Sequence, residues 1–225
     1  MTPLDYAARI AYSSIETLNF TYEMAKKYAD SKGVYVECGV AAGAQIIAML
    51  YGANKLVFAF DSFEGIPLPS NRDDQMPGII MLTKAEQKAL PDPGKQALLT
   101  SGATVVSIDD FLDNIRMAFS ENLSDYNSRI KYNLYTVQGW FEETVTDLPD
   151  RMLFEDIAIL RLDGDLYNST WVCLQHLFEK VIKGGVVIID DWQLPGCQAA
   201  CKEYFALIGY EPDYKFISNI AYFFK

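Results

Sequence analysis

The sequence is poor in the residues that several classes of enzymes and nucleic-acid-binding proteins require. It contains one histidine, His176, so a multi-histidine metal site is excluded and a Ser-His hydrolase would have to use that one residue. Because His176 lies in the helical-looking stretch WVCLQHLFEK, we expect it to be structural. With 19 Lys and Arg against 30 Asp and Glu, the formal net charge is −11, which disfavours nucleic acid as a partner.

Long hydrophobic runs are also absent. No apolar run approaches the length needed to span a bilayer, and the start MTPLDYAARIAYSS lacks the basic and apolar parts of a signal peptide. We therefore expect a cytoplasmic protein that does not act on membranes. The four cysteines stand among apolar or small residues, and we interpret them as buried free thiols: Cys38, Cys173, Cys197 and Cys201.

The length and composition are typical of one globular domain. The chain has 225 residues, half of them hydrophobic, which predicts a single domain over 1–225 with a sizeable core. Apolar residues at mixed three and four spacings predict one or two amphipathic helices within residues 1–30. Residues 62–102 are rich in Pro, Gly and Asp, and we interpret 68–104 as a candidate lid or insertion.

Strand-like and helix-like stretches alternate along the chain. The predicted strands are VYVECGV, KLVFAFD, KYNLYTV, DIAILRLD and GGVVIIDD, the last entered through a helix stop at Lys183, Gly184 and Gly185. Ser107 is a predicted helix cap with Asp110 at the third helical position, and YKFISNIAYFFK predicts a C-terminal hairpin turning at Ser218 and Asn219. The alternation predicts an α/β fold with a doubly wound, mostly parallel sheet, in which ligands bind beyond the carboxyl ends of the strands.

The ends of the first two predicted strands favour a bound nucleoside. The first strand runs into ECGVAAG, in which small residues allow the backbone to turn tightly and approach a ligand. The second ends at Asp61, and a carboxylate at this position can accept hydrogen bonds from ribose hydroxyls. A tight turn without a ligand, or a NAD-binding oxidoreductase, would give a similar pattern.

Carboxylates end the fourth and fifth predicted strands. Asp163 and Asp165 follow the fourth strand, and Asp190 and Asp191 follow the fifth. We expect these two strands to be neighbours, so that the carboxylates converge and must share protons, spread apart or hold a cation. An all-carboxylate set suits Mg²⁺, Mn²⁺ or Ca²⁺ rather than zinc. The alternative is a group of solvated turn residues.

Several blocks of the sequence, taken together and in order, resemble the macrocin O-methyltransferase family. These blocks are VECGVAAG, FDSFEGIP, VQGWFEETV, LRLDGDLYNSTW and GGVVIIDDW, which cover roughly residues 34–67 and 134–192. The resemblance implies the class I methyltransferase fold, a Rossmann-like sheet of about seven strands with an antiparallel last strand. It also implies S-adenosylmethionine as cofactor, a divalent metal and a hydroxyl acceptor on a sugar or related natural product.

The resemblance further implies a role for individual residues. Those expected to border the cofactor are Glu37, Gly39, Val40, Ala41 and Gly43 in the first turn, Asp61 on the ribose with Ser62 beside it, and Gln138, Gly139 and Trp140 near the adenine. The metal ligands implied are Asp163, Asp190 and Asp191, with Asp163 also as the base. Ala41 stands where the family has its middle glycine, and the segment from Leu68 to Thr104 follows no family pattern.

Two rival interpretations remain at this point. A NAD(P)-dependent Rossmann oxidoreductase accounts for the glycine turn and Asp61 but gives no role to Asp190 and Asp191. A non-catalytic protein with a methyltransferase fold would not need the intact acidic residues. For an enzyme, a small hydroxylated acceptor with vicinal hydroxyls, such as a sugar diol or a catechol-like compound, is favoured because it can chelate the metal. An acceptor that binds the metal through one hydroxyl oxygen is the alternative. The acceptor's identity, and whether the chain forms a homo-oligomer, stay open.

Overall fold

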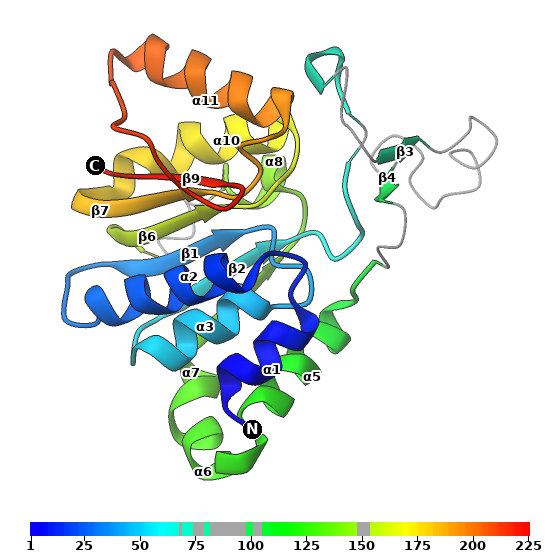
Figure 1. Ribbon diagram of the computed structural model, residues 1–225, viewed down its shortest axis with the longest axis vertical. Helices are drawn as coiled ribbons and strands as arrows, with labels where there is room; N and C mark the ends of the chain where they lie inside the picture. Colours follow the sequence, from blue (N-terminus) through cyan, green and yellow to red (C-terminus); the bar gives the residue numbers. More distant parts are fainter. Residues whose placement is uncertain (68, 74–78, 82–97, 101–104, 148–153) are drawn as a thin grey trace.

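The computed structural model describes residues 1–67, 69–73, 79–81, 98–100, 105–147 and 154–225 (Figure 1). Within these residues one sheet has seven strands in the order β5-β2-β1-β6-β7-β9-β8. The strands of this sheet are β1 (Val34–Cys38), β2 (Val57–Asp61), β5 (Leu134–Gln138), β6 (Ile157–Leu162), β7 (Val181–Ile189), β8 (Lys215–Ile217) and β9 (Ile220–Phe224).

The pairing confirms the predicted fold class. β1 pairs in parallel with β2 and β6, β2 with β5, and β6 with β7, whereas β9 runs antiparallel to β7 and to β8. From β1 the chain adds β2 and then β5 on one side of the sheet. From β6 it adds β7 and then the hairpin of β8 and β9 on the other side. The strand order therefore reverses between β1 and β6, which is where ligands bind in doubly wound sheets.

Helices cover both faces of the sheet (Figure 1). One face carries α1 (Pro3–Ile10), α2 (Ile15–Lys27), α3 (Ala44–Gly52) and α5 (Ile108–Ala118). The other carries α8 (Phe141–Thr144), α10 (Tyr167–Leu177) and α11 (Pro195–Ile208). Two short helices, α6 (Leu123–Asp125) and α7 (Lys131–Asn133), precede β5. The predicted N-terminal helical segment thus contains two helices, each started by a side-chain cap, from Thr2 and from Ser14.

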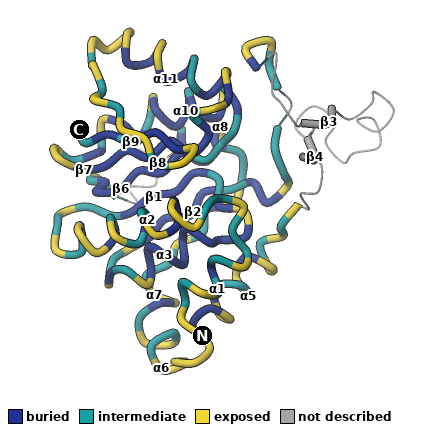
Figure 2. Tube along the Cα trace, in the orientation of Figure 1, coloured by how far each residue is buried: buried dark blue, intermediate teal, exposed yellow. Residues whose placement is uncertain are grey.

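The hydrophobic core has two parts, one on each face of the sheet (Figure 2). Successive strand side chains point to opposite faces. Tyr35 accordingly packs with the α1–α3 side, whereas Val36 packs with the α10–α11 side. This double burial explains why the central strands are nearly continuous apolar runs. The four cysteines are buried and free, as predicted.

Two local predictions are wrong. The expected helix stop at Lys183–Gly185 lies inside β7, because α10 ends earlier, at Leu177. The β6–β7 register shifts between Ile157 and Ile159, so the glycines belong to an irregular strand that passes close to β6. Residues 131–133 are helical rather than the start of a strand. The Ser107 cap and the hairpin turn at Ser218 are confirmed.

The candidate lid, 68–104, lies largely outside the described residues. Within it, β3 (Ile79–Met81) pairs antiparallel with β4 (Leu98–Thr100), and residues 69–73 are described. Ser70 and Asp73 form a short turn in which Asp73 accepts hydrogen bonds from the Ser70 backbone and hydroxyl. The assignment as a lid stays a prediction. No helix in the described ranges is long and apolar enough to cross a membrane.

Candidate active site

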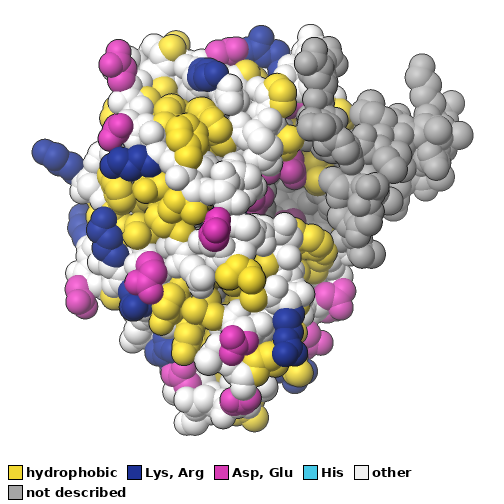
Figure 3. All heavy atoms as spheres, viewed as in Figure 1, with side chains coloured by type: hydrophobic (Ala, Val, Ile, Leu, Met, Phe, Trp, Pro, Cys, Tyr) yellow, Lys and Arg dark blue, Asp and Glu magenta, His cyan; other side chains and the backbone are white. Residues whose placement is uncertain are grey.

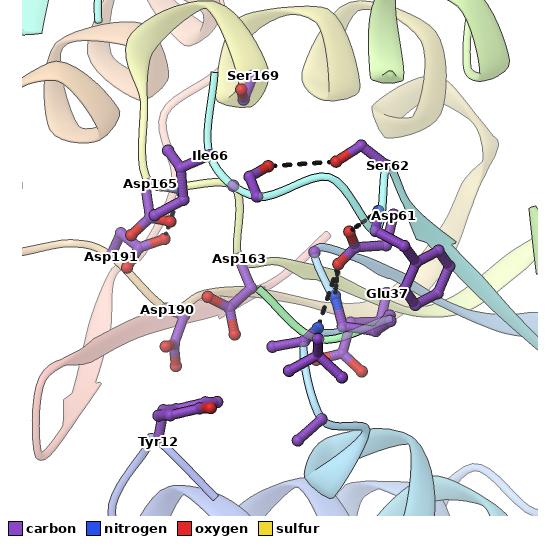
Figure 4. Close-up of a pocket in the computed structure, with 18 of the residues that line it drawn as sticks. Tyr12, Glu37, Asp61, Ser62, Ile66, Asp163, Asp165, Ser169, Asp190 and Asp191 are labelled. Carbon is purple, nitrogen blue, oxygen red and sulfur yellow. Dashed lines mark hydrogen bonds between the residues drawn. The ribbon is translucent and has the colours of Figure 1, made fainter. Parts of the chain in front are cut away.

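A pocket of about 380 Å³ lies at the carboxyl ends of the central strands. In Figure 3 acidic side chains are visible inside a recess on one face, and Figure 4 shows the carboxylates that line the pocket. Among the predicted site residues, those that line it are Glu37, Gly39, Val40, Ala41, Asp61, Ser62, Gly139, Trp140, Asp163, Asp190 and Asp191. The lining does not include Gly43 or Gln138. The pocket volume is in the range of small-molecule sites.

The turn after β1 requires glycine at two positions. Gly39 has a φ of +88°, and a Cβ there would lie 1.8 Å from the carbonyl oxygen of Asp163. Gly43 has a φ of +89° and precedes α3, with Phe111 against the place where its Cβ would be. Gly43 therefore shapes the turn but does not line the pocket. Ala41 is left-handed too, with a φ of +44°, which is strained for a residue with a Cβ.

Asp61 organises this turn. Its Oδ2 accepts hydrogen bonds from the backbone N–H groups of Val40, at 2.8 Å, and Ala41, at 3.1 Å. Its Oδ1 accepts from the N–H of Phe63, at 2.7 Å. A carboxylate offers about four lone-pair positions, so Asp61 keeps acceptor capacity for a ligand hydroxyl.

The end of β5 lies beside Asp61. Gln138 pairs with Asp61 across the two strands, and the N–H of Gly139 donates to the Asp61 carbonyl at 2.9 Å. Gly139, with a φ of +135°, turns the chain into α8, and Trp140 precedes that helix at the pocket wall. The predicted adenine segment is therefore divided: Gly139 and Trp140 reach the pocket, whereas Gln138 remains in the sheet.

The predicted metal ligands meet at the ends of β6 and β7. The two strands are neighbours, with Leu162 paired to Ile189, so Asp163 and Asp190 leave the sheet at the same level. Asp163, Asp190 and Asp191 each offer a carboxylate oxygen, and these atoms lie within 4.8 Å of one another. We call these three residues the acidic cluster.

Arg161 is a functional residue that the sequence reasoning missed. Its guanidinium is fully buried and donates from Nε to Glu37 Oε1 at 3.0 Å. Its Nη2 donates to Asp163 Oδ2 at 3.1 Å and to Asp190 Oδ1 at 2.5 Å. The sequence does contain an indication of these ion pairs, because an arginine inside the apolar strand DIAILRLD must have buried partners of opposite charge.

Glu37, Asp163, Asp165 and Asp191 have pKa values raised above those of ordinary carboxyl groups. Burial, followed by the charges of Asp190 and Asp191, raises the pKa of Asp163 well above its usual value. Burial, followed by the charge of Asp165, likewise raises the pKa of Asp191. Burial raises the pKa of Asp165 to about 7 and that of Glu37 to about 8, the latter against the opposing effect of Arg161. The site therefore favours bound protons or a bound cation.

The acidic cluster fits a hard divalent ion. In each residue one carboxylate oxygen is held by the protein: Asp163 Oδ2 and Asp190 Oδ1 by Arg161, and Asp191 Oδ2 by the N–H of Asp165 at 2.9 Å. The other oxygen of each accepts no hydrogen bond from the part of the chain that the structure describes. Three oriented carboxylate oxygens with spare capacity are ligands that suit Mg²⁺, Mn²⁺ or Ca²⁺.

The connection between α1 and α2 forms a further wall that the sequence did not reveal. Tyr12 and Ser13 line the pocket, and Tyr12 lies across from Asp163 and Asp190 in Figure 4 with 67% of its surface exposed. Ser13 accepts a hydrogen bond from Gln45 Nε2 at 2.7 Å. Gln45 Oε1 is buried at the pocket wall without a partner among the described residues. Helical periodicity predicts helices, but it gives no sign of where their connection lies.

The chain is similar in sequence to O-methyltransferases that act on natural products. Mycinamicin III 3''-O-methyltransferase of Micromonospora griseorubida is 30% identical over 154 residues, 67% of this chain and 49% of that protein. The 8-demethyl-8-(2,3-dimethoxy-alpha-L-rhamnosyl)-tetracenomycin-C 4'-O-methyltransferase of Streptomyces olivaceus is 42% identical over 66 residues, 29% of this chain and 24% of that protein. The chain thus spans half or less of the length of these curated relatives.

The similarity extends to the fold and to the family. The solved structure of the O-methyltransferase NovP superposes with a TM-score of 0.70 and 26% identity, covering 96% of this chain and 82% of that one. The sequence profile described as Macrocin-O-methyltransferase (TylF) matches residues 23–225. That match includes β1, β2, β6 and β7 with the site residues at their ends. The chain belongs to the macrocin O-methyltransferase family.

Proposed function

We propose that the protein is an S-adenosylmethionine-dependent O-methyltransferase that methylates a hydroxyl of a sugar, glycosylated natural product or similar diol with the help of a divalent ion. One observation carries the proposal. The turn held by Asp61 and the acidic cluster of Asp163, Asp190 and Asp191 open into the same pocket. A cofactor bound at the turn and an acceptor bound at the acidic cluster would therefore lie next to each other.

The cofactor half is formed by the ends of β1, β2 and β5. Gly39 and Ala41 present backbone at the pocket surface, Asp61 would accept from the ribose, and Trp140 supplies an apolar wall for the adenine. When bound, S-adenosylmethionine supplies a methyl group on a sulfonium, which already has a good leaving group. The protein then has to align the acceptor oxygen, the methyl carbon and the sulfur and to exclude water.

The acceptor half contains the acidic cluster. The three aspartates would hold the ion, which when bound acts as a Lewis acid and lowers the pKa of an acceptor hydroxyl. Asp163 would take the hydroxyl proton. Its Oδ2 is held by Arg161, its Oδ1 is free, and its side chain retains 28% exposure, so it is accessible from the pocket. The bound cofactor would supply the methyl group to the acceptor oxygen, with S-adenosylhomocysteine as the other product.

The nature of the acceptor is supported by the pocket walls. Tyr12 and Ile66 offer apolar surface on two sides of the carboxylates, an arrangement that suits the apolar face of a sugar ring (Figure 4). Two vicinal hydroxyls could share the same ion. The Streptomyces olivaceus relative is named as a 4'-O-methyltransferase of a compound that carries a 2,3-dimethoxy-alpha-L-rhamnosyl group, which agrees with a sugar acceptor and with binding of the ion through a single hydroxyl.

Two measurements test the proposal. Calorimetry with S-adenosylhomocysteine, NAD and NADP should give binding for S-adenosylhomocysteine alone; binding of NAD or NADP instead would favour an oxidoreductase. Transfer of a labelled methyl group from S-adenosylmethionine should then be assayed on glycosides with and without a free vicinal diol. Tight S-adenosylhomocysteine binding without transfer to any acceptor class would favour a non-catalytic protein.

A further inference from the structure

We propose that Arg161 is a positioning residue that holds Asp163 and Asp190 in the geometry needed to bind the ion, and that Glu37 anchors Arg161 for this task. The inference rests on the proposed metal site and goes beyond it, because it assigns the shape of the site to two residues that are not in the ligand set. The alternative is that Arg161 only neutralises buried carboxylates.

The contacts of Arg161 join three strands at one level. The side chain starts on β6, reaches Glu37 on β1 through Nε, and reaches Asp190 after β7 through Nη2. The same Nη2 also donates to Asp163. A planar guanidinium fixes the directions of these donors relative to one another, which an ammonium on a flexible stem does not.

Arg161 engages only one oxygen of each carboxylate. It takes Oδ2 of Asp163 and Oδ1 of Asp190, and the other oxygen of each accepts no hydrogen bond from the described residues. Because one nitrogen serves both carboxylates, it sets their spacing. Groups that orient metal ligands in this way commonly change metal affinity by about 10–100-fold when they are removed.

Glu37 fixes the other side of the guanidinium. It is 1% exposed, and only its Oε1 is bonded, to Arg161 Nε. Glu37 is not among the three residues whose oxygens converge. In the described residues, the hydrogen bond of Glu37 therefore connects it to the acidic cluster through Arg161.

Positioning and simple neutralisation predict different metal affinities for two variants of Arg161, one that keeps the charge and one that removes it. Arg161→Lys keeps the positive charge but loses the planar fork, so positioning predicts weaker metal binding and neutralisation predicts no change. Arg161→Met removes the charge. Neutralisation then predicts tighter binding, because the ion replaces the lost charge, whereas positioning again predicts weaker binding.

The experiment is a titration of the whole protein, without cofactor, with Mn²⁺ followed by electron paramagnetic resonance. Wild type should bind one ion, and Arg161→Lys and Arg161→Met should each bind at least about tenfold more weakly. Arg129→Lys is the matched control, because Arg129 makes a comparable double contact to Asp125, with Nε at 2.8 Å and Nη2 at 2.7 Å, and does not line the pocket. It should bind Mn²⁺ like wild type. Circular dichroism melting checks that each variant is folded.

Glu37 gives a second test that does not depend on an Arg161 variant folding. Glu37→Ala removes the anchor and should weaken Mn²⁺ binding several-fold, whereas Glu37→Gln keeps an acceptor for Nε and should stay within about threefold of wild type. Unchanged affinity in folded Arg161→Lys, tighter binding in Arg161→Met, or equal affinities in the two Glu37 variants would overturn the inference while leaving the metal site in place. Wild type that binds no Mn²⁺ would overturn both.

Discussion

Asp61 accepts a hydrogen bond from the backbone N–H of Val40 at 2.8 Å and so joins the end of β2 to the turn after β1. The two strands are parallel neighbours, and Cys38 pairs with Phe60 just before this contact. The carboxylate thus holds the turn in place, and in the proposed function its remaining acceptor position binds a ribose hydroxyl.

We expect Asp61→Ala to weaken binding of S-adenosylhomocysteine by roughly 1–3 kcal/mol, the usual cost of removing a charge-assisted hydrogen bond. Asp61→Asn should lose less, since its carbonyl oxygen can still accept one of the backbone N–H groups. Calorimetry measures both. Unchanged affinity in Asp61→Ala would refute the ribose assignment.

The left-handed Ala41 predicts a stabilising substitution. Its φ of +44° costs about 1–2 kcal/mol for a residue with a Cβ, and its side chain is exposed, so glycine removes strain without losing burial. Ala41→Gly should therefore raise the free energy of unfolding, by about 1 kcal/mol at most. The higher conformational entropy of the unfolded glycine variant offsets part of the relieved strain. Urea unfolding measures this. The buried neighbour Ala42 is not left-handed, and Ala42→Gly should lower stability; the same sign for both variants would argue against strain at Ala41.

Asp163 and Asp165 should differ as catalytic residues. Asp163→Asn should keep the fold and reduce turnover by at least about 10²-fold, the usual range for loss of a general base. Asp165→Asn should have a smaller effect, because Asp165 holds Asp191 through its backbone N–H and asparagine tolerates its left-handed φ of +59°. Methyl-transfer rates with an acceptor from the glycoside panel measure both. Similar losses would contradict the separate roles.

The raised pKa values of Asp165, about 7, and Glu37, about 8, predict how stability depends on pH. Between about pH 4 and pH 8 the folded state holds protons that the unfolded state has released, because the unfolded pKa values are near 4. Stability of the metal-free protein should therefore fall as the pH rises through this window. Urea midpoints in EDTA should decrease from pH 5 to about pH 8. A midpoint that rises over this range would show that these carboxyls are ionised in the folded protein.

Much of the fold and half of the site could be predicted from strand ends. A parallel sheet brings the carboxyl ends of its strands to one edge, so Asp163, Asp165, Asp190 and Asp191 were predicted to converge from their places after two apolar runs, and all four line the pocket. The hairpin at Ser218 followed from its turn residues in the same way. Such features depend on local sequence and on one rule of topology.

The remainder depends on contacts between distant parts of the chain. Arg161 has its partners on β1 and β7, and nothing near it in the sequence identifies them. Tyr12 reaches the pocket because two helices fold back over the sheet. The error at Gly184 has a similar cause: a pair of glycines is typical of a helix stop, but here Gly184 has a φ of +78° within the strand and Gly185 lies against β6, where a Cβ would be 3.1 Å from the Ala158 carbonyl oxygen.

Metal removal tests the proposed mechanism most directly. Protein treated with EDTA and verified as metal-free by elemental analysis should be assayed for transfer of a labelled methyl group from S-adenosylmethionine to a diol-bearing acceptor, with and without added Mg²⁺. The account predicts that the activity of the wild type is lost in EDTA and returns with Mg²⁺. In the Asp190→Asn and Asp191→Asn variants, added Mg²⁺ should restore activity weakly or not at all. Methylation at the full rate by the verified metal-free protein would contradict it.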